Sequence, residues 1–458
     1  MIVYGAGDGG AQTIRAMLGN RSSSYMPIAL IDDDPAKRNL RIQGVPVRGQ
    51  RGDLAAIAQQ TQAEIVVIAI PSVPSSVLRA IVDEAERADL DVRVLPPTQE
   101  LVAGIGLGDI RELRDTDLLG RRAIDTDLDT IGSYLRDRRV LVTGAGGSIG
   151  SELCRQIAGF APKSLIMLDR DESALHGVCL SIDGRALFDR RDVVVADIRD
   201  ADRLAEVFAE HKPEVVFHAA ALKHLPLLEM YPEEGWKTNV EGTNNVLRVA
   251  AKVGVRHFVN VSTDKAADPM SVLGYTKRIA EQLTAWYANR ISGDWVSVRF
   301  GNVLGSRGSV LETFTAQVAV GGPITVTHPD VTRYFMTCSE ACQLVIQSAA
   351  VGYRGEALVL DMGEPVRILD VAERLASRSS MPIDIEFTGL RPGEKLHEAL
   401  VSESEIDIRR AHSLISHVPV PALTPSQLGL VDRSSSDALT ASMASLCKDR
   451  NDLSALTL

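Results

Sequence analysis

Three glycines, Gly144, Gly147 and Gly150, stand between an apolar run at 140–142 and a series of apolar residues at helical spacing that begins at Ile149. This order predicts a strand, a tight loop and a helix. Glycine suits such a loop because the backbone must turn sharply, approach a pyrophosphate closely and direct the free N–H groups of the helix N-terminus at it. The chemistry predicted from this GxxGxxG spacing is the binding of a dinucleotide cofactor.

An acidic residue completes the pattern. Asp169 follows the next apolar run, nineteen residues after Gly150, where a carboxylate accepts hydrogen bonds from the ribose hydroxyls of NAD. Arg170 beside it is able to bind the 2′-phosphate of NADP, so NAD is the predicted cofactor and NADP the less favoured one. The alternative is a glycine-rich turn followed by a solvated aspartate.

A second polar group, Ser262-Thr263-Asp264-Lys265, follows the apolar run 258–261. If that run is a strand, the group lies at the carboxyl edge of the sheet, where open α/β folds bind ligands. An acid and a base there suit an elimination, whereas an exposed Asp-Lys pair is ordinarily only solvated. At neutral pH these roles require the pKa of Lys265 to fall and that of Asp264 to rise, by about three units each. Burial is expected to drive both changes, although the mutual attraction of the two groups opposes them.

Strands and helices must bring the two groups together. Apolar runs at 193–196, 215–221 and 258–261 alternate with helical patterns, the last from about Leu273 to Asn289, and predict a doubly wound parallel sheet within residues 139–401. Asp197 follows one strand and is a candidate for hydrogen bonding to adenine, although most aspartates at strand ends face water. The small side chains that begin at Ala219 leave room for a cofactor or for close helix packing.

A second Rossmann-like unit is predicted over residues 1–100. Gly5, Gly7 and Gly10 have GxGxxG spacing, and the acidic cluster 32–34 follows the next apolar run. That cluster serves equally well as a turn and helix cap, so a ligand for this unit stays open. Residues 101–138 carry alternating charge with little apolar spacing and are predicted to be the interdomain linker.

Composition limits the class of protein. The 458 residues are 45% hydrophobic and 24% charged, which is ordinary for two or three globular domains. A net charge of −11 argues against a nucleic-acid or anionic-membrane surface. The five cysteines lack metal-ligand spacing, which indicates a reducing cytosol and no metal site. No apolar run approaches the roughly twenty residues of a membrane helix, so the chain is expected to be soluble and cytoplasmic.

Four motifs together resemble the extended short-chain dehydrogenase/reductases: TGAGGSIG at 143–150, HAAALKH at 218–224, STDKA at 262–266 and RFGNVLGSRGSV at 299–310. They are most similar to the polysaccharide-biosynthesis CapD-type nucleotide-sugar 4,6-dehydratases, which include UDP-N-acetylglucosamine 4,6-dehydratase. The likeness covers about residues 139–400. Membrane-bound members carry a Rossmann-like domain ahead of it, so the resemblance implies either a naturally soluble form or a truncated one, the latter located at the inner face of the membrane.

The resemblance implies a reaction and roles for four residues. In this family NAD takes hydride from carbon 4 of the hexose, the elements of water leave carbons 5 and 6, and hydride returns to carbon 6. By position, Thr263 is expected to hydrogen-bond the hydroxyl that is oxidised, and Lys277 to hold the nicotinamide ribose. Lys265 is expected to be the base at carbon 5, and Asp264 the acid that protonates the leaving hydroxyl.

One family position differs in this chain. Four residues before Lys277, where the superfamily has tyrosine and large dehydratases often have methionine, stands Leu273, which cannot take a proton. Tyr275 is a weak substitute because it lies about 200° around the helix from Lys277. Two alternatives therefore stay open: an NAD-dependent epimerase, which needs no acid at carbon 6, and a cofactor-binding assembly protein. The Asp264-Lys265 pair favours dehydration.

The resemblance also implies binding residues and an assembly. The predicted cofactor residues are Gly144, Gly147, Ser148, Ile149, Gly150, Asp169, Arg170, Asp197, Ile198, Ala219 and Lys277. The predicted residues for a UDP-sugar substrate are Lys223, Asn302, Arg307, Arg333, Arg391 and Glu394, each of which alone is more typical of a surface charge or turn. Residues 402–458 are predicted to be a packing or oligomer-contact extension, and a homo-oligomer is expected.

Overall fold

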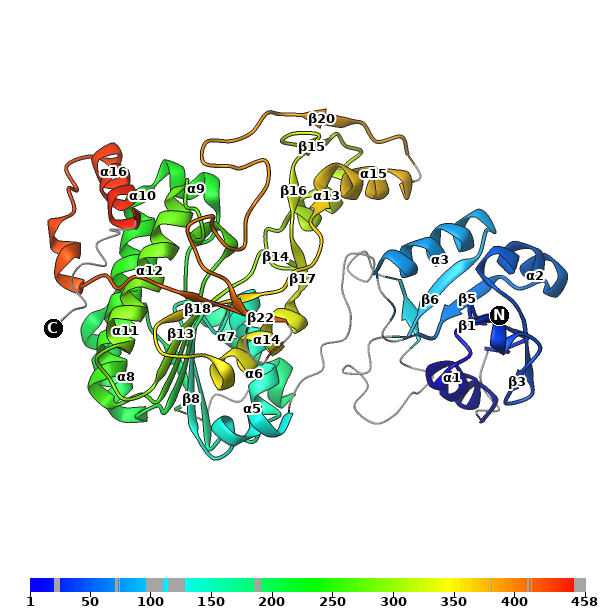
Figure 1. The fold of residues 1–458 in the computed structure, drawn as a ribbon, viewed down its shortest axis with the longest axis horizontal. Helices are drawn as coiled ribbons and strands as arrows, with labels where there is room; N and C mark the ends of the chain where they lie inside the picture. Colours follow the sequence, from blue (N-terminus) through cyan, green and yellow to red (C-terminus); the bar gives the residue numbers. More distant parts are fainter. Residues whose placement is uncertain are drawn as a thin grey trace. The chain divides into compact units, whose positions relative to one another are not determined.

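The computed structural model has two compact units, Met1–Asp125 and Thr126–Leu458 (Figure 1). It describes residues 1–19, 25–70, 73, 75–95, 110–113, 128–184, 191–379, 381–409, 412 and 414–448. The predicted linker, residues 101–138, lies largely outside the described residues. Two described parts of it are ordered elements, β7 (Arg111–Glu112) and α5 (Leu128–Leu135).

The first unit is a Rossmann-like layered structure. Its described strands follow the order β3-β4-β2-β1-β5-β6-β7. The inner strands β4, β2, β1, β5 and β6 run parallel, and the edge strands β3 and β7 run antiparallel to their neighbours. Both faces of the sheet are covered: Ile2 and Tyr4 pack with α2 and α3, and Val3 between them packs with α1. The bounds are β1 (Ile2–Tyr4), α1 (Asp8–Gly19), β2 (Ala29–Ile31), β3 (Arg41–Ile42), β4 (Val45–Gly49), α2 (Leu54–Thr61), β5 (Ile65–Ile68), α3 (Ser75–Arg87) and β6 (Asp91–Val94).

The second unit contains a larger sheet. Its described strands follow the order β10-β9-β8-β11-β12-β13-β18-β22-β21, parallel from β10 to β18 and antiparallel at β22 and β21. The strand order reverses between β8 and β11, and ligands of doubly wound sheets bind at such a point. The bounds are β8 (Arg139–Thr143), β9 (Ser164–Asp169), β10 (Val193–Val195), β11 (Val215–His218), β12 (His257–Val261), β13 (Asp294–Arg299), β18 (Glu356–Leu360), β21 (Ile408–Arg409) and β22 (Ile415–Pro419). The predicted doubly wound α/β fold is confirmed.

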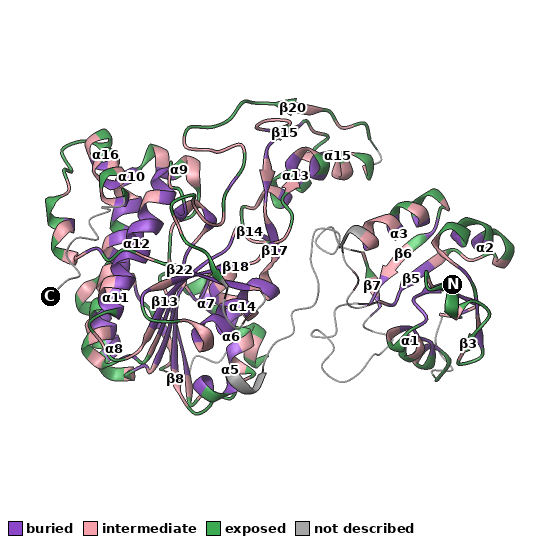
Figure 2. Ribbon diagram, in the orientation of Figure 1, coloured by how far each residue is buried: buried purple, intermediate pink, exposed green. Residues whose placement is uncertain are grey.

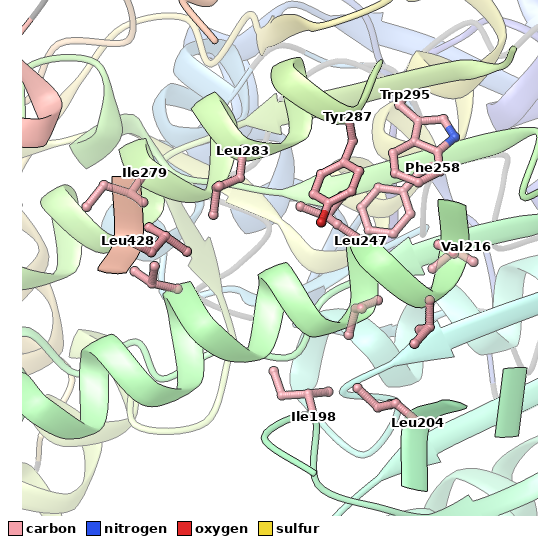
Figure 3. Packing of buried hydrophobic residues seen from close by; sticks show 14 of the residues in the cluster. Ile198, Leu204, Val216, Leu247, Phe258, Ile279, Leu283, Tyr287, Trp295 and Leu428 are labelled. Carbon is pink, nitrogen blue, oxygen red and sulfur yellow. The ribbon is translucent and has the colours of Figure 1, made fainter. Parts of the chain in front are cut away.

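Helices cover both faces of this sheet, and its strands are buried along most of their length (Figure 2). On one face, α8, α11 and α12 pack against a cluster in which Phe258 stacks on Trp295 at 4.8 Å between ring centroids (Figure 3). On the other face lie α5, α6, α7 and α14. The bounds are α6 (Ser148–Ala158), α7 (Glu172–Asp183), α8 (Ala201–His211), α11 (Thr243–Val253), α12 (Val272–Ala288) and α14 (Cys338–Val351).

Smaller elements continue from the carboxyl edge of the sheet. Three two-stranded sheets, β14-β17, β15-β20 and β16-β19, carry α13 and α15 in the part of the unit that follows β13. The tail also packs on this unit, since β22 pairs with β18 and α16 contacts α12. The bounds are α9 (Leu225–Met230), α10 (Pro232–Gly235), β14 (Asn302–Leu304), α13 (Val310–Ala319), β15 (Ile324–Val326), β16 (Thr332–Arg333), β17 (Phe335–Thr337), β19 (Val366–Arg367), α15 (Ile368–Ser377), β20 (Ile385–Phe387) and α16 (Ser436–Cys447).

One helix differs from its prediction. The helical pattern at 240–252 predicts a start at Val240, but the helix begins earlier as a π-helical segment, η5 (Trp236–Gly242), and becomes regular only in α11. Segments with π-helical hydrogen bonding often occur at functional sites. Here the segment places Asn239, whose amide bonds both backbone groups of Leu222 at 2.8 and 3.0 Å and the hydroxyl of Thr276 at 3.1 Å.

Candidate functional site

The glycine loop follows β8 as predicted and cannot hold larger residues. Gly144 has a positive φ of 67°, and a β-carbon there would lie 2.6 Å from the backbone nitrogen of Ala220. A β-carbon at Gly150 would lie 2.0 Å from the carbonyl oxygen of Gly144. Helix α6 then begins at Ser148 with no side-chain cap on its first amides. The loop therefore leaves N–H groups available to a phosphate.

Asp169 lies beside this loop at the end of β9. Its carboxylate accepts hydrogen bonds from the backbone amides of Gly146 at 2.8 Å and Asp171 at 3.0 Å. These bonds orient the carboxylate next to the glycine loop. Loop and carboxylate line a cavity of about 230 Å³, whose walls also include the predicted cofactor residues Gly147, Arg170, Asp197, Ile198 and Ala219.

Asp197 lines this cavity and is also paired with neighbouring side chains. Its carboxylate bonds the guanidinium of Arg199 at 2.8 Å and lies 3.9 Å from that of Arg170. Although burial raises the pKa of Asp197, the hydrogen bonds from Arg199 hold it below the ordinary value. Arg199 therefore holds Asp197 at the wall of this cavity, and the hydrogen bond from Asp197 to adenine stays a prediction.

A second, larger cavity of about 750 Å³ brings the glycine loop and the second polar group together. It is lined by Ser148, Ile149 and Gly150 from the loop and by Thr263 and Lys265 from the segment after β12. Four of the six predicted substrate residues line it as well: Lys223, Asn302, Arg307 and Arg391. Arg307 lines both cavities and donates to the carbonyl oxygen of Gly146.

The other two predicted substrate residues are placed differently. Arg333 and Glu394 are not among the residues lining the larger cavity, and they form an ion pair at 2.8 Å in which the Arg333 side chain is 8% exposed. Arg333 also donates to the backbone oxygens of Thr332 and Leu396. Arg333 and Glu394 are therefore partners of each other, and their contact with a substrate stays a prediction.

The polar group after β12 forms a short chain of hydrogen bonds. The hydroxyl of Thr263 donates to Asp264 Oδ1 at 2.8 Å, and Lys265 Nζ lies 3.1 Å from the same oxygen. The Asp264 side chain is fully buried, and its Oδ2 has no hydrogen-bond partner among the described residues. Thr263 and Lys265 thus face the cavity, and Asp264 lies behind them with one oxygen free.

Lys277 lines the same cavity from α12. Its Nζ donates to the carbonyl oxygen of Val261 at 2.6 Å, and burial lowers the pKa of Lys277 to about 8. Leu273 also faces the cavity one turn earlier. Tyr275 instead packs beside the main hydrophobic cluster, so it contributes no hydroxyl to the lining that the described residues form.

The protonation of Lys265 differs from the prediction. Burial lowers the pKa of Lys265, but the carboxylates of Asp264 and Glu398 outweigh that effect and hold it above its ordinary value. The predicted fall is therefore corrected, because a second carboxylate that no local pattern indicates lies 3.4 Å from the amine. In this arrangement Lys265 is an ammonium at neutral pH.

Residues that support the candidate site also escape sequence reasoning, because they lie far away in the chain. Glu281 accepts from the Ser262 hydroxyl at 2.6 Å and from Arg299 at 2.7 Å, and Glu405 binds Arg299 at 2.7 Å. This buried network supports the segment after β12. Its only sequence signal is the presence of charged residues in otherwise apolar runs, such as Arg299 at the end of β13.

Comparisons with known proteins agree with this geometry. The family model described as polysaccharide biosynthesis protein matches residues 140–419, and the model described as CoA-binding domain matches residues 1–96. The chain belongs to the polysaccharide biosynthesis protein family. Its membership confirms the resemblance to the CapD-type proteins.

Two curated relatives match most of the chain. The probable polysaccharide biosynthesis protein EpsC of Bacillus subtilis is 42% identical over 88% of this chain and 69% of its own length. The capsular polysaccharide biosynthesis protein CapD of Staphylococcus aureus is 39% identical over 94% of this chain and 73% of its own length. Among solved structures, Pen from Bacillus thuringiensis is 29% identical with a TM-score of 0.58, covering 65% of this chain and 98% of that one.

No helix in the described parts of either unit has the length and apolar character that crossing a membrane requires.

Proposed function

We propose that this protein is an NAD-dependent nucleotide-sugar 4,6-dehydratase that converts a UDP-N-acetylhexosamine, expected to be UDP-N-acetylglucosamine, into the 4-keto-6-deoxy sugar nucleotide for surface polysaccharide. The observation that carries the proposal is that Thr263, Lys265 and Lys277 line one cavity together with the start of α6. A nucleotide sugar and the reactive end of a dinucleotide meet in such a cavity. Membership of the polysaccharide biosynthesis protein family supports a role in making the sugar precursors of a polysaccharide.

The residues fit a nicotinamide dinucleotide. A β-carbon at Gly144 or Gly150 would collide with backbone atoms. Because these positions have no side chain, the loop turns tightly and a pyrophosphate is able to approach the backbone amides of α6. The oriented carboxylate of Asp169 suits two ribose hydroxyls and repels a 2′-phosphate, which supports NAD over NADP. When bound, the nicotinamide supplies a hydride acceptor at carbon 4 and a hydride donor at carbon 6.

The side chains of this site account for the accompanying proton transfers. Thr263 accepts the proton of the 4-hydroxyl and passes its own proton to Asp264 Oδ1, 2.8 Å away. This relay takes the place of the tyrosine that the superfamily has at the position of Leu273. Asp264 is then a carboxylic acid and protonates the hydroxyl that leaves carbon 6 as water. Lys265 first releases the proton of its ammonium to water; the free amine then takes the proton from carbon 5 and returns it there after the hydride transfer to carbon 6. Lys277 is held by the Val261 carbonyl at the position proposed for the nicotinamide ribose.

A mass measurement tests the reaction. The full chain is incubated with NAD and UDP-N-acetylglucosamine, and the sugar nucleotide is weighed. Loss of one water supports the dehydratase. Altered stereochemistry at constant mass would instead support an epimerase, and an unchanged sugar nucleotide would support a binding protein.

The variant Lys265→Ala tests the proposed base. We expect water loss to fall by at least about a hundredfold, the usual contribution of a positioned acid or base, while NAD binding persists. The matched control is Lys252→Ala, which removes an exposed lysine on α11. Full activity of Lys265→Ala would rule out the assigned base.

A further inference from the structure

Three charged side chains meet behind the wall of the larger cavity. Lys265 Nζ lies 3.1 Å from Asp264 Oδ1 and 3.4 Å from Glu398 Oε1. The Asp264 and Glu398 side chains are 0% and 3% exposed, whereas that of Lys265 is 17% exposed and reaches the cavity. A buried carboxylate is retained at such a place only if a charge partner compensates for its lost hydration. The ammonium of Lys265 is that partner for Glu398.

Glu398 belongs to a segment, residues 394–405, that has turns and bends but neither helix nor strand. Ion pairs instead hold this segment on several elements of the second unit, among them α12, which carries Lys277. Besides Lys265–Glu398, these pairs are Arg333–Glu394 at 2.8 Å, Lys395–Asp268 at 2.9 Å, Arg278–Glu405 at 2.7 Å and Arg299–Glu405 at 2.7 Å. Several pairs in a network fix a segment where one exposed pair would not.

We propose that Glu398 is a positioning residue for Lys265: its carboxylate holds the amine at the cavity wall and sets how readily the amine gives up its proton. The inference deepens the proposed function and rests on it, because Lys265 is the base of that reaction. Glu398 is not among the residues that line the cavity, so it acts through Lys265 and not on the sugar.

The charges that face Lys265 fix the direction of the effect. Asp264 from its own turn and Glu398 from segment 394–405 favour the ammonium, whereas Arg333 from β16 opposes it. Lys277 and Arg391 share the cavity wall and remain in every variant. Removing the negative charge of Glu398 therefore eases the loss of a proton from Lys265.

The experiment measures the titration of Lys265 directly. The full chain is acetylated briefly with acetic anhydride over a range of pH, and the extent of modification at Lys265 is read by peptide mass spectrometry. We expect Glu398→Gln to move the midpoint down by about one unit or more, the usual effect of one close opposite charge. The matched control Glu356→Gln removes a carboxylate of β18 that pairs with His417 of β22, and it should leave the midpoint unchanged.

A second variant covers a failure of Glu398→Gln to fold. Glu398→Asp keeps the charge on a shorter side chain, so its acetylation midpoint should lie between those of the wild type and Glu398→Gln. If Glu398→Gln does not fold, the midpoint of Glu398→Asp should still lie below that of the wild type. An unchanged midpoint in the folded variants would overturn the inference.

Turnover then separates positioning from mere support of the fold. We expect Glu398→Gln to shift the acid limb of kcat to lower pH and to lower its plateau about tenfold, with KM within about twofold of the wild type. A lower plateau without a shift of the limb would show a structural role and contradict the proposal. Acetylation needs no turnover. If Glu398→Gln shifted the midpoint while the wild type released no water from the sugar nucleotide, the dehydratase would be refuted and the effect of Glu398 on Lys265 would stand.

Discussion

The two units of this chain contain the same glycine-loop geometry at the start of their sheets, but they differ in the residues at the end of the parallel strand that stands two strands away. A β-carbon at Gly10 would lie 1.9 Å from the carbonyl oxygen of Gly5, just as one at Gly150 would lie 2.0 Å from that of Gly144. Each loop also donates a backbone amide to the aspartate of the next strand, from Ala6 to Asp32 at 2.7 Å in the first unit. Loop and aspartate are therefore properties of the Rossmann-like fold.

The difference lies in the partners of these groups. In the first unit Lys37 bonds Asp32 at 3.0 Å. Strand β6 stands two strands from β1, as β12 stands two strands from β8, and it ends in the apolar residues Val94 and Leu95. In the second unit the Asp169 carboxylate accepts from backbone amides, and β12 ends in the polar group that begins at Ser262. A glycine loop thus does not by itself identify a catalytic unit, since in the proposed function the residues at the end of β12 supply the chemistry.

The largest expected effect comes from paired glycine substitutions. Gly150→Ala places a methyl group against a backbone oxygen of its loop, so we expect NAD affinity to fall at least about a hundredfold, together with a stability loss of about 1–3 kcal/mol. Gly10→Ala makes the equivalent collision in the first unit and should leave NAD affinity and a stoichiometry of one per chain unchanged. Calorimetric titration of both variants measures these quantities.

The matched control for these substitutions is Gly177→Ala in α7, where a β-carbon meets nothing within 4 Å. A lower stoichiometry in Gly10→Ala would show that the first unit also holds the cofactor. The contrast between the two units would then be wrong.

A smaller effect is expected from the paired aspartates. Asp169→Asn removes the charge next to the ribose site, and hydrogen bonds to a charged group contribute about 1.5–3 kcal/mol. We therefore expect NAD affinity to fall about 10- to 100-fold and the preference over NADP to narrow. Asp32→Asn should change neither quantity, and equilibrium titration with both cofactors distinguishes the cases. Equal losses in the two variants would contradict the assignment of NAD to the second unit.

The shared features are the ones that the sequence predicts well. Gly144, Gly150 and Asp169 form a local pattern in which strand, turn and helix lie within about thirty residues, so spacing alone places them correctly. Alternating apolar runs likewise predict the doubly wound sheet, because burial on both faces leaves continuous apolar strands. The segment after β12 can be placed by the same argument, since strand ends of a parallel sheet share one edge.

The features that give the second unit its chemistry depend on distant contacts. Glu398 and Glu405 come from a segment without periodicity, and nothing near them in the sequence indicates that they contact Lys265 and Arg299. The predicted fall in the pKa of Lys265 is wrong for this reason: the sequence indicates burial of the amine but not the second carboxylate. Arg333 and Glu394 each suit a substrate contact when taken singly, whereas their mutual pairing emerges only when β16 and segment 394–405 are placed side by side.

The smallest expected effect concerns Lys37, the residue that most clearly separates the two aspartates. Burial raises the pKa of Asp32, but hydrogen bonds from Ala6, Asp34 and Lys37 hold it below its ordinary value. A carboxyl whose folded-state pKa is depressed stabilises the protein above its unfolded-state value near 3.8 and loses that contribution as pH falls through the folded-state value. Lys37→Gln removes one cause of the depression, so the first unit should lose less stability between about pH 5 and 3.

Because the Lys37 side chain is 32% exposed, its removal should change the stability of the first unit at pH 7 by less than about 1 kcal/mol. Peptide-resolved hydrogen exchange of β1 and β2 in the full chain follows this unit alone, and the β8 peptides serve as the internal reference. If Lys37→Gln instead created NAD binding in the first unit, the ion pair itself would be what keeps Asp32 from a ribose. The two units would then differ by one side chain at this position and not by their strand ends.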